Sequence, residues 1–86
     1  MQTEKIRVVL VDDHPLVLEG IVARLDNEPS VDVVGSANNG AQAIELVAEV
    51  KPDVILMDIS MPVMTGFEAT ELLQKEYPDV RVLILS

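Results

Sequence analysis

Apolar and polar positions along the 86 residues follow two different periods. Four short apolar runs rich in Val, Ile and Leu are typical of strands, and the segments between them repeat apolar residues every three or four positions, as helices do. The runs predict strands at residues 6–11, 31–37, 54–57 and 80–85. The second run is weaker toward its end, where Gly35 and Ser36 replace apolar residues.

Turn and capping residues mark where the three helices should begin. Pro15 suits a first helical position, because its missing N–H would be unpaired there in any residue, and Asp13 or His14 is then the cap. The Asn-Asn-Gly turn at 38–40 supplies a cap for the second helix, and Thr65 can cap the third. The helices should end near residues 27–29, at Lys51-Pro52 and at Pro78.

Each predicted helix has an apolar stripe that should pack on a sheet. The residues expected to face inward are Leu18, Ile21, Val22 and Leu25, then Ala43, Ile44, Val47 and Ala48, then Phe67, Thr70, Leu73 and Tyr77. Strands and helices alternate, which predicts right-handed crossovers and a parallel, doubly wound α/β sheet with helices on its faces. The third strand, 54–57, is apolar throughout and should be buried on both sides. No linker or repeat divides the chain.

Carboxylates close the first and third predicted strands: Asp12 and Asp13 follow the first, and Asp58 follows the third. Ligand chemistry collects at the carboxyl ends of parallel strands, so the three side chains meet if these strands are neighbours. Mg²⁺ would relieve their mutual repulsion, because it takes few carboxylates and keeps several waters. Its expected ligands are Asp13, Asp58 and a carbonyl near Ser60, with Asp12 bound directly or through water. Taken alone, Asp58 is equally well explained as the cap of the following turn.

Composition narrows the function. Fifteen acidic and six basic residues give a net charge of −9, so the chain should repel nucleic acid and has no basic stripe to bind it. The absence of cysteine excludes disulfides and thiolate chemistry. No apolar run is long enough for a signal sequence or a membrane span. We therefore expect a soluble, cytoplasmic protein.

Four stretches give a more specific indication: Val-Leu-Val-Asp-Asp-His-Pro at 9–15, Ala-Asn-Asn-Gly-Ala-Gln-Ala at 37–43, residues 53–68 around Asp58, and Val-Leu-Ile-Leu-Ser at 82–86. In this order they resemble the receiver domain of bacterial two-component response regulators. The Asp-Asp-His-Pro form is most similar to the LuxR-type (NarL/FixJ) subfamily. The resemblance implies a flavodoxin-like, CheY-like fold with strand order 2-1-3-4.

The resemblance also implies roles for particular residues. Asp58 would accept a phosphoryl group from a histidine kinase, and Ser86 would be the hydroxyl switch. Asp12, Asp13, Asp58 and the Ser60 carbonyl would hold Mg²⁺, while Met61, Pro62 and Gly66 would shape the loop after Asp58. Such a receiver promotes its own phosphorylation rather than acting as an enzyme on other substrates, and it controls a DNA-binding output domain.

The chain departs from the family pattern in its extent. Residues 1–86 correspond to the N-terminal part of a receiver, so the fourth helix, fifth strand, fifth helix and output domain are expected to be missing. The family lysine that ends the fifth strand has no counterpart, because Lys5, Lys51 and Lys75 lie in other elements. The strand at 80–85 would then be a bare edge, and we expect homo-oligomers to form through it. Gln42, where glutamate is common, changes little.

The same residues allow three other interpretations. His14 is expected to be a surface loop residue rather than a ligand or base. A phosphatase of the haloacid-dehalogenase type would need Asp at position 60, where this chain has Ser60. The remaining alternative is a receiver-like module for protein interaction or dimerisation that is not phosphorylated.

Overall fold

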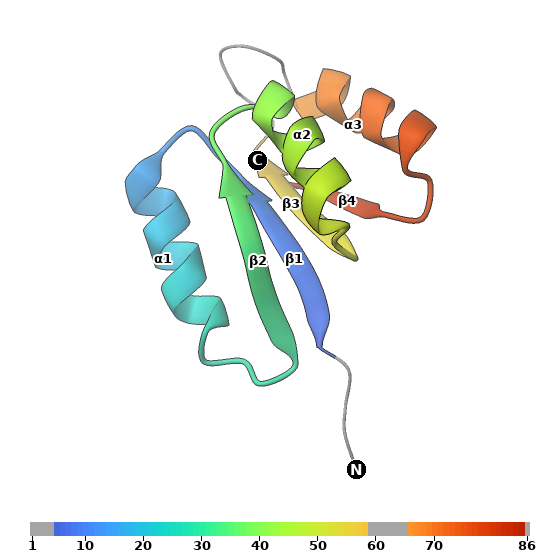
Figure 1. Cartoon of the computed structure of the whole chain (residues 1–86). Coiled ribbons are helices and arrows are strands. Elements are labelled where there is room, and N and C mark those ends of the chain that lie inside the picture. Colours follow the sequence, from blue (N-terminus) through green and yellow to red (C-terminus); the bar gives the residue numbers. More distant parts are fainter. Residues whose placement is uncertain (1–4, 59–65, 86) are drawn as a thin grey trace.

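The computed structural model describes residues 5–58 and 66–85. Strands and helices alternate as expected (Figure 1). The elements are β1 (Ile6–Val11), α1 (Pro15–Leu25), β2 (Val31–Ala37), α2 (Gly40–Val50), β3 (Val54–Asp58), α3 (Gly66–Glu76) and β4 (Arg81–Leu85).

The four strands form one parallel sheet in the order β2-β1-β3-β4, which confirms the expected order and fold class. Helix α1 covers one face, and α2 and α3 cover the other (Figure 1). Pairing between β1 and β3 runs from Val8 opposite Val54 to Val11 opposite Met57. The two strands therefore reach the same edge of the sheet together.

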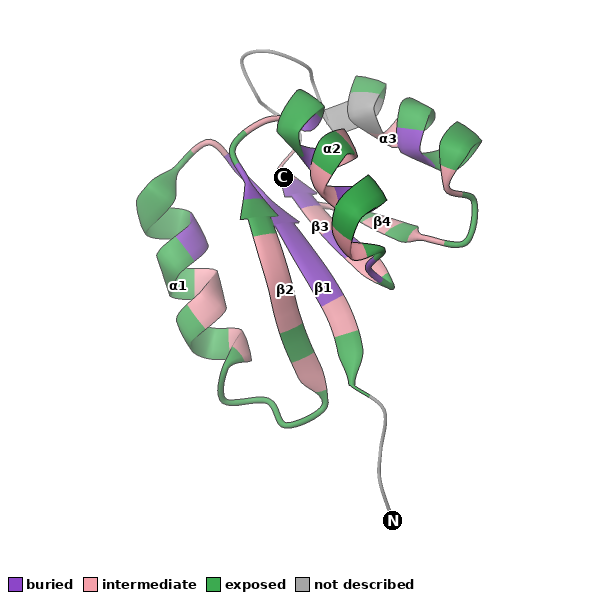
Figure 2. Ribbon diagram, in the orientation of Figure 1, coloured by how far each residue is buried: buried purple, intermediate pink, exposed green. Residues whose placement is uncertain are grey.

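Two apolar clusters hold the layers together, one on each face of the sheet. The cluster beneath α2 and α3 contains Val9, Val11, Ala37, Ala43, Val47, Ile55, Met57 and Leu73, and the cluster beneath α1 contains Val8, Leu10 and Leu18. Successive residues of β1 point to opposite faces, so this strand contributes to both clusters. Its second half is buried completely (Figure 2).

Strand β3 is not buried equally on its two sides. Ile55 and Met57 are fully buried beneath α2 and α3, whereas Val54 and Leu56 are only half-buried on the side of α1. The expectation that this strand is buried on both sides is therefore only half right. The reason is that α1 packs over β1 and β2, so the part of the same sheet face that β3 and β4 form is less covered.

The second helix begins with a reciprocal cap. The side chain of Asn39 accepts a hydrogen bond from the backbone N–H of Gln42 at 2.9 Å, and Gln42 Oε1 accepts one from the backbone N–H of Asn38 at 3.0 Å. The first bond satisfies a donor that the first helical turn leaves unpaired, and the second ties the residue before the N-cap to that turn. Gln42 thus has a structural role that its departure from the family pattern did not suggest.

Gly35 explains how β2 continues through a segment of weak strand propensity. The pairing with β1 shifts by one residue here, from Val33 opposite Val8 to Gly35 opposite Val9. A Cβ atom on Gly35 would lie 3.0 Å from Leu46 Cδ2. The missing side chain therefore lets α2 pack closely on the strand, and the strand continues to Ala37.

Several predicted details are wrong at element boundaries. The first helix ends at Leu25, a little before the expected 27–29, and the fourth strand begins at Arg81 rather than at residue 80. Ala48 is exposed rather than inward, and Leu46 and Val50 pack against the core in its place. Of the two caps that the sequence allowed for α1, Asp13 and His14, the structure has His14, although its side chain makes no capping hydrogen bond.

A network of backbone and side-chain hydrogen bonds stabilises the edge of the sheet at which β1 and β3 begin. The backbone N–H of Arg7 donates to Asp53 Oδ2, and its guanidinium donates to the carbonyl of Lys51, both at 2.9 Å. Lys51 ends α2 in the left-handed region, with φ of 48°. These contacts set where β3 enters the sheet beside β1. Among the described residues, no helix is long and apolar enough to cross a membrane.

We predict that Asn39→Ala lowers the free energy of unfolding by about 1 kcal/mol, because it removes the side-chain cap of α2. Urea unfolding followed by circular dichroism measures the change. Asn38→Ala is the matched control, since only the backbone of Asn38 takes part in the described cap. An equal loss in both variants would contradict this assignment of the cap.

Candidate metal centre at the carboxyl edge of the sheet

Adjacent strands bring the acidic residues together. Asp58 is the last residue of β3, and Asp12 directly follows Val11, which pairs with Met57. The backbone N–H of Asp12 donates to the carbonyl of Ala37 at 3.1 Å, so the chain stays held to β2 as it leaves the sheet. The carboxylates of both strands thus lie at one edge, as the sequence predicted.

Four side chains contribute to the resulting cluster. Asp12, Asp13, His14 and Asp58 each offer a ligand atom, and these atoms lie within 4.8 Å of one another. Asp12 is buried with 8% exposure, and Asp13 and Asp58 are half-buried. His14 is open to solvent, with 63% of its side chain exposed. The cluster is therefore accessible from outside, with its most buried carboxylate at the base.

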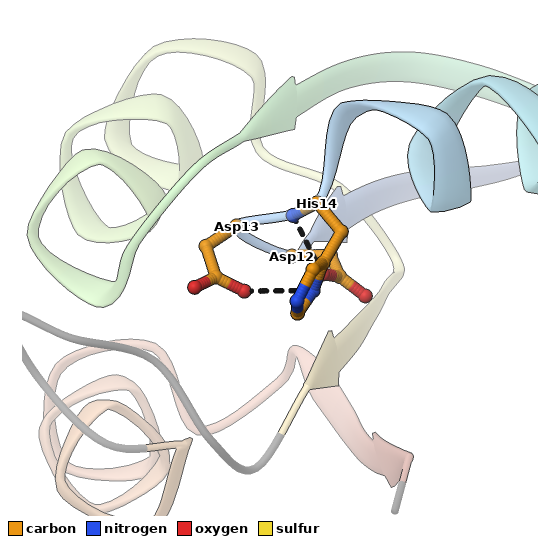
Figure 3. A network of polar contacts seen from close by, with 3 residues as sticks. All are labelled: Asp12, Asp13 and His14. Atoms are coloured by element: carbon orange, nitrogen blue, oxygen red, sulfur yellow. Dashed lines mark hydrogen bonds and ion pairs between the residues drawn. The ribbon is translucent and has the colours of Figure 1, made fainter.

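His14 makes two hydrogen bonds to the same oxygen of Asp12 (Figure 3). Its backbone N–H lies 2.9 Å from Asp12 Oδ1, and its ring Nδ1 lies 2.7 Å from that oxygen. The hydrogen bond to Asp12, followed by the charge of Asp13, raises the pKa of His14 above its ordinary value of 6.5. When the ring is protonated, it places positive charge beside these carboxylates.

Asp13 Oδ1 is buried and has no hydrogen-bond partner among the described residues. It lies 2.9 Å from His14 Nδ1, and the two form an ion pair when the imidazole is protonated. An orphaned buried carboxylate oxygen is costly unless a cation approaches it. This oxygen and the surrounding carboxylates match the oxygen donors that Mg²⁺ takes. The residues present therefore fit a divalent cation.

The remaining predicted site residues cannot be placed in this way. Ser60, Met61, Pro62 and Ser86 lie outside the described residues, as does the proposed cap Thr65. Gly66 is the first residue of α3. The lysines Lys5, Lys51 and Lys75 precede β1, β3 and β4, respectively, so all three lie toward the sheet edge opposite Asp58.

The sequence predicts the exposure of His14 but not the contact of its ring with the carboxylates. His14 was expected to be a surface loop residue, and the ring is indeed exposed, yet its nitrogen lies within the cluster of carboxylates. The available signal was its position two residues after Asp12. At that spacing an aspartate accepts a hydrogen bond from the backbone N–H of a turn, and that turn brings the next side chain back toward the carboxylate.

The parallel sheet and its acidic edge define an α/β domain of the receiver type. Residues 8–86 match the response regulator receiver domain, and the chain belongs to this family. It is similar to the transcriptional regulatory protein DegU of Brevibacillus brevis, with 51% identity over 82 residues, which cover 95% of this chain and 35% of DegU. The chain thus spans about a third of that relative.

Solved structures agree with this assignment. The signal receiver domain of the putative response regulator NarL from Mycobacterium tuberculosis has a TM-score of 0.90 and 45% identity, covering 95% of this chain and 66% of that one. A two-component response regulator of the LuxR family from Aurantimonas sp. SI85-9A1 has a TM-score of 0.89 and 36% identity, covering 94% and 58%. The expected likeness to LuxR-type receivers is confirmed.

We predict that His14, the single histidine of the chain, titrates above 6.5 in the metal-free protein. Its folded-state pKa is raised, so protonation stabilises the fold fully below pH 6.5, and this contribution is lost as the pH rises through the folded-state pKa. Titration of the imidazole signal by NMR measures the pKa. Asp12→Ala should return it toward 6.5, whereas Asp32→Ala, at the other end of the sheet, should not. An unshifted pKa in the unmodified protein would contradict the geometry.

Proposed function

We propose that this receiver accepts a phosphoryl group on Asp58 from a histidine kinase and that Mg²⁺ is its cofactor. The observation that carries the proposal is the convergence of Asp12, Asp13 and Asp58, whose ligand atoms lie with that of His14 within 4.8 Å. Membership of the receiver family supports it. Asp12 and Asp13 would hold the ion together with Asp58 and the Ser60 carbonyl.

The proposed chemistry uses the end of β3. A carboxylate oxygen of Asp58 attacks phosphorus, forming an acyl phosphate, while the bond from phosphorus to the kinase imidazole breaks and the imidazole leaves with its electron pair. Bound Mg²⁺ supplies charge that neutralises the incoming phosphoryl oxygens. Asp58 suits this role because the strand fixes its backbone and its side chain is half-buried rather than enclosed.

Other parts of the proposal rest on the family. Ser86 would act as the hydroxyl switch, and Met61, Pro62 and Gly66 would shape the loop that keeps Asp58 accessible. The chain would not be an enzyme toward other substrates. The protein would act in the cytoplasm and reach DNA through an output domain rather than through these acidic residues. Its likeness to a transcriptional regulatory protein supports this role.

We predict that acetyl phosphate with Mg²⁺ transfers one phosphoryl group to the chain, detected as a mass increase of the intact protein. Asp58→Asn should gain none, and chelation of Mg²⁺ should prevent labelling of the unmodified protein. Labelling should be slow in these 86 residues, because the three lysines lie toward the opposite edge of the sheet. Asp79→Asn, an exposed aspartate between α3 and β4, is the matched control and should be labelled normally. Robust labelling of Asp58→Asn would refute the assignment.

A second candidate function is favoured by the surface of β4. This strand lies at the end of the described sheet and pairs there with β3, and Leu83 on it is 53% exposed. An edge strand with an exposed leucine can pair with another chain. The alternative is therefore a dimerisation module, with a second copy of this chain as the partner, that does not take up phosphate.

We predict that the chain self-associates through β4 and that Leu83→Lys shifts it toward the monomer, because a charge on an edge strand opposes pairing. Light scattering over a range of concentrations measures the mass. Leu72→Lys is the control, since Leu72 is 41% exposed but lies on α3. A monomer in the unmodified protein at all concentrations would rule out the dimerisation module.

A further inference from the structure

The imidazole of His14 lies where a metal ligand would be expected. Its Nδ1 is 2.7 Å from Asp12 Oδ1 and 2.9 Å from Asp13 Oδ1. Two ligand atoms bound at right angles, each about 2.1 Å from an ion, are separated by about 3.0 Å. Nδ1 is therefore already spaced from each of the two carboxylate oxygens approximately as neighbouring ligands of one ion are.

The ring is also free to adjust to an ion. Most of its surface is open to solvent, and its position depends on the two contacts to Asp12 and Asp13 rather than on packing in a core. When an ion occupies the place of the proton between Nδ1 and the carboxylates, that proton leaves to solvent and the nitrogen lone pair faces the ion. The orphaned Oδ1 of Asp13 gains a partner in the same step.

We propose that His14 is a ligand for first-row transition ions and so determines which divalent cations this site prefers. Imidazole suits ions such as Mn²⁺, Co²⁺ and Zn²⁺, whereas Mg²⁺ takes oxygen ligands and water. The site thus holds Co²⁺ through nitrogen and oxygen and Mg²⁺ through oxygen alone. The inference rests on the proposed function only in that both ions use the carboxylates of Asp12, Asp13 and Asp58.

Calorimetric titration of the full chain with Co²⁺ and with Mg²⁺ tests the proposal, and the visible spectrum of bound Co²⁺ reports nitrogen ligation independently of any activity. His14→Ala should weaken Co²⁺ binding by about tenfold or more, whereas it should not weaken Mg²⁺ binding, because Mg²⁺ does not use the imidazole. His14→Asn is the matched variant, because its amide can still donate a hydrogen bond to Asp12 but offers no imidazole. It should lose Co²⁺ affinity as His14→Ala does, with the same change in spectrum.

The outcomes separate this inference from the proposed function. Unchanged Co²⁺ affinity and spectrum in both His14 variants would overturn the inference, and so would an equal weakening of both ions, which marks a positioning role through Asp12. Asp13→Ala provides the reference for the site itself and should weaken both ions. If Mg²⁺ binding depends on Asp13 but Co²⁺ binding ignores His14, the inference alone fails. If neither ion binds the unmodified chain, the proposed magnesium site fails together with it.

Discussion

The parallel pairing of β1 with β3 is the constraint on which the rest of the site depends. Val8 and its partner Val54 are 46 positions apart along the chain, yet the register of the pairing ends both strands at the same edge of the sheet.

 The intervening residues 12–53 form α1, β2 and α2, and the crossovers return β3 to the side of β1 away from β2. A shift of one residue in this register would turn Ile55 and Met57 away from their core and would also move Asp58 out of line with Asp12. The packing of the core and the geometry of the site are therefore set by the same pairing.

Bringing carboxylates together opposes folding, and contacts from His14 offset part of the repulsion. The ring of His14 contacts both Asp12 and Asp13, and the backbone N–H of His14 adds a second bond to Asp12. The ring nevertheless leaves one oxygen of Asp13 without a hydrogen bond. A carboxylate cluster that is compensated in part, but not completely, can therefore gain from binding a cation.

The alternation of strand and helix could be predicted from the sequence, because each segment carries its own hydrophobic period. The ends of elements were less certain: Leu25 ends α1 where backbone geometry, rather than apolar spacing, decides. Ala48 was misplaced because a small apolar residue fits either side of a helix, while the larger Leu46 packs over Gly35. The strand order predicts that Asp12 and Asp58 meet. The position of the His14 ring depends instead on a local turn, which the hydrophobic period of the sequence does not predict.

The two edges of the sheet at which its strands begin and end have different roles: one stabilises the pairing of the strands, and the other carries the candidate site. At the edge where the strands begin, hydrogen bonds of Arg7 with Lys51 and Asp53 join β1 firmly to β3. At the other edge, Asp13 Oδ1 has no hydrogen bond among the described residues, and the ring of His14 is more exposed than the carboxylate of Asp12. Because β1 is buried on both faces between these edges, a change of charge at the carboxyl edge acts on a rigid support.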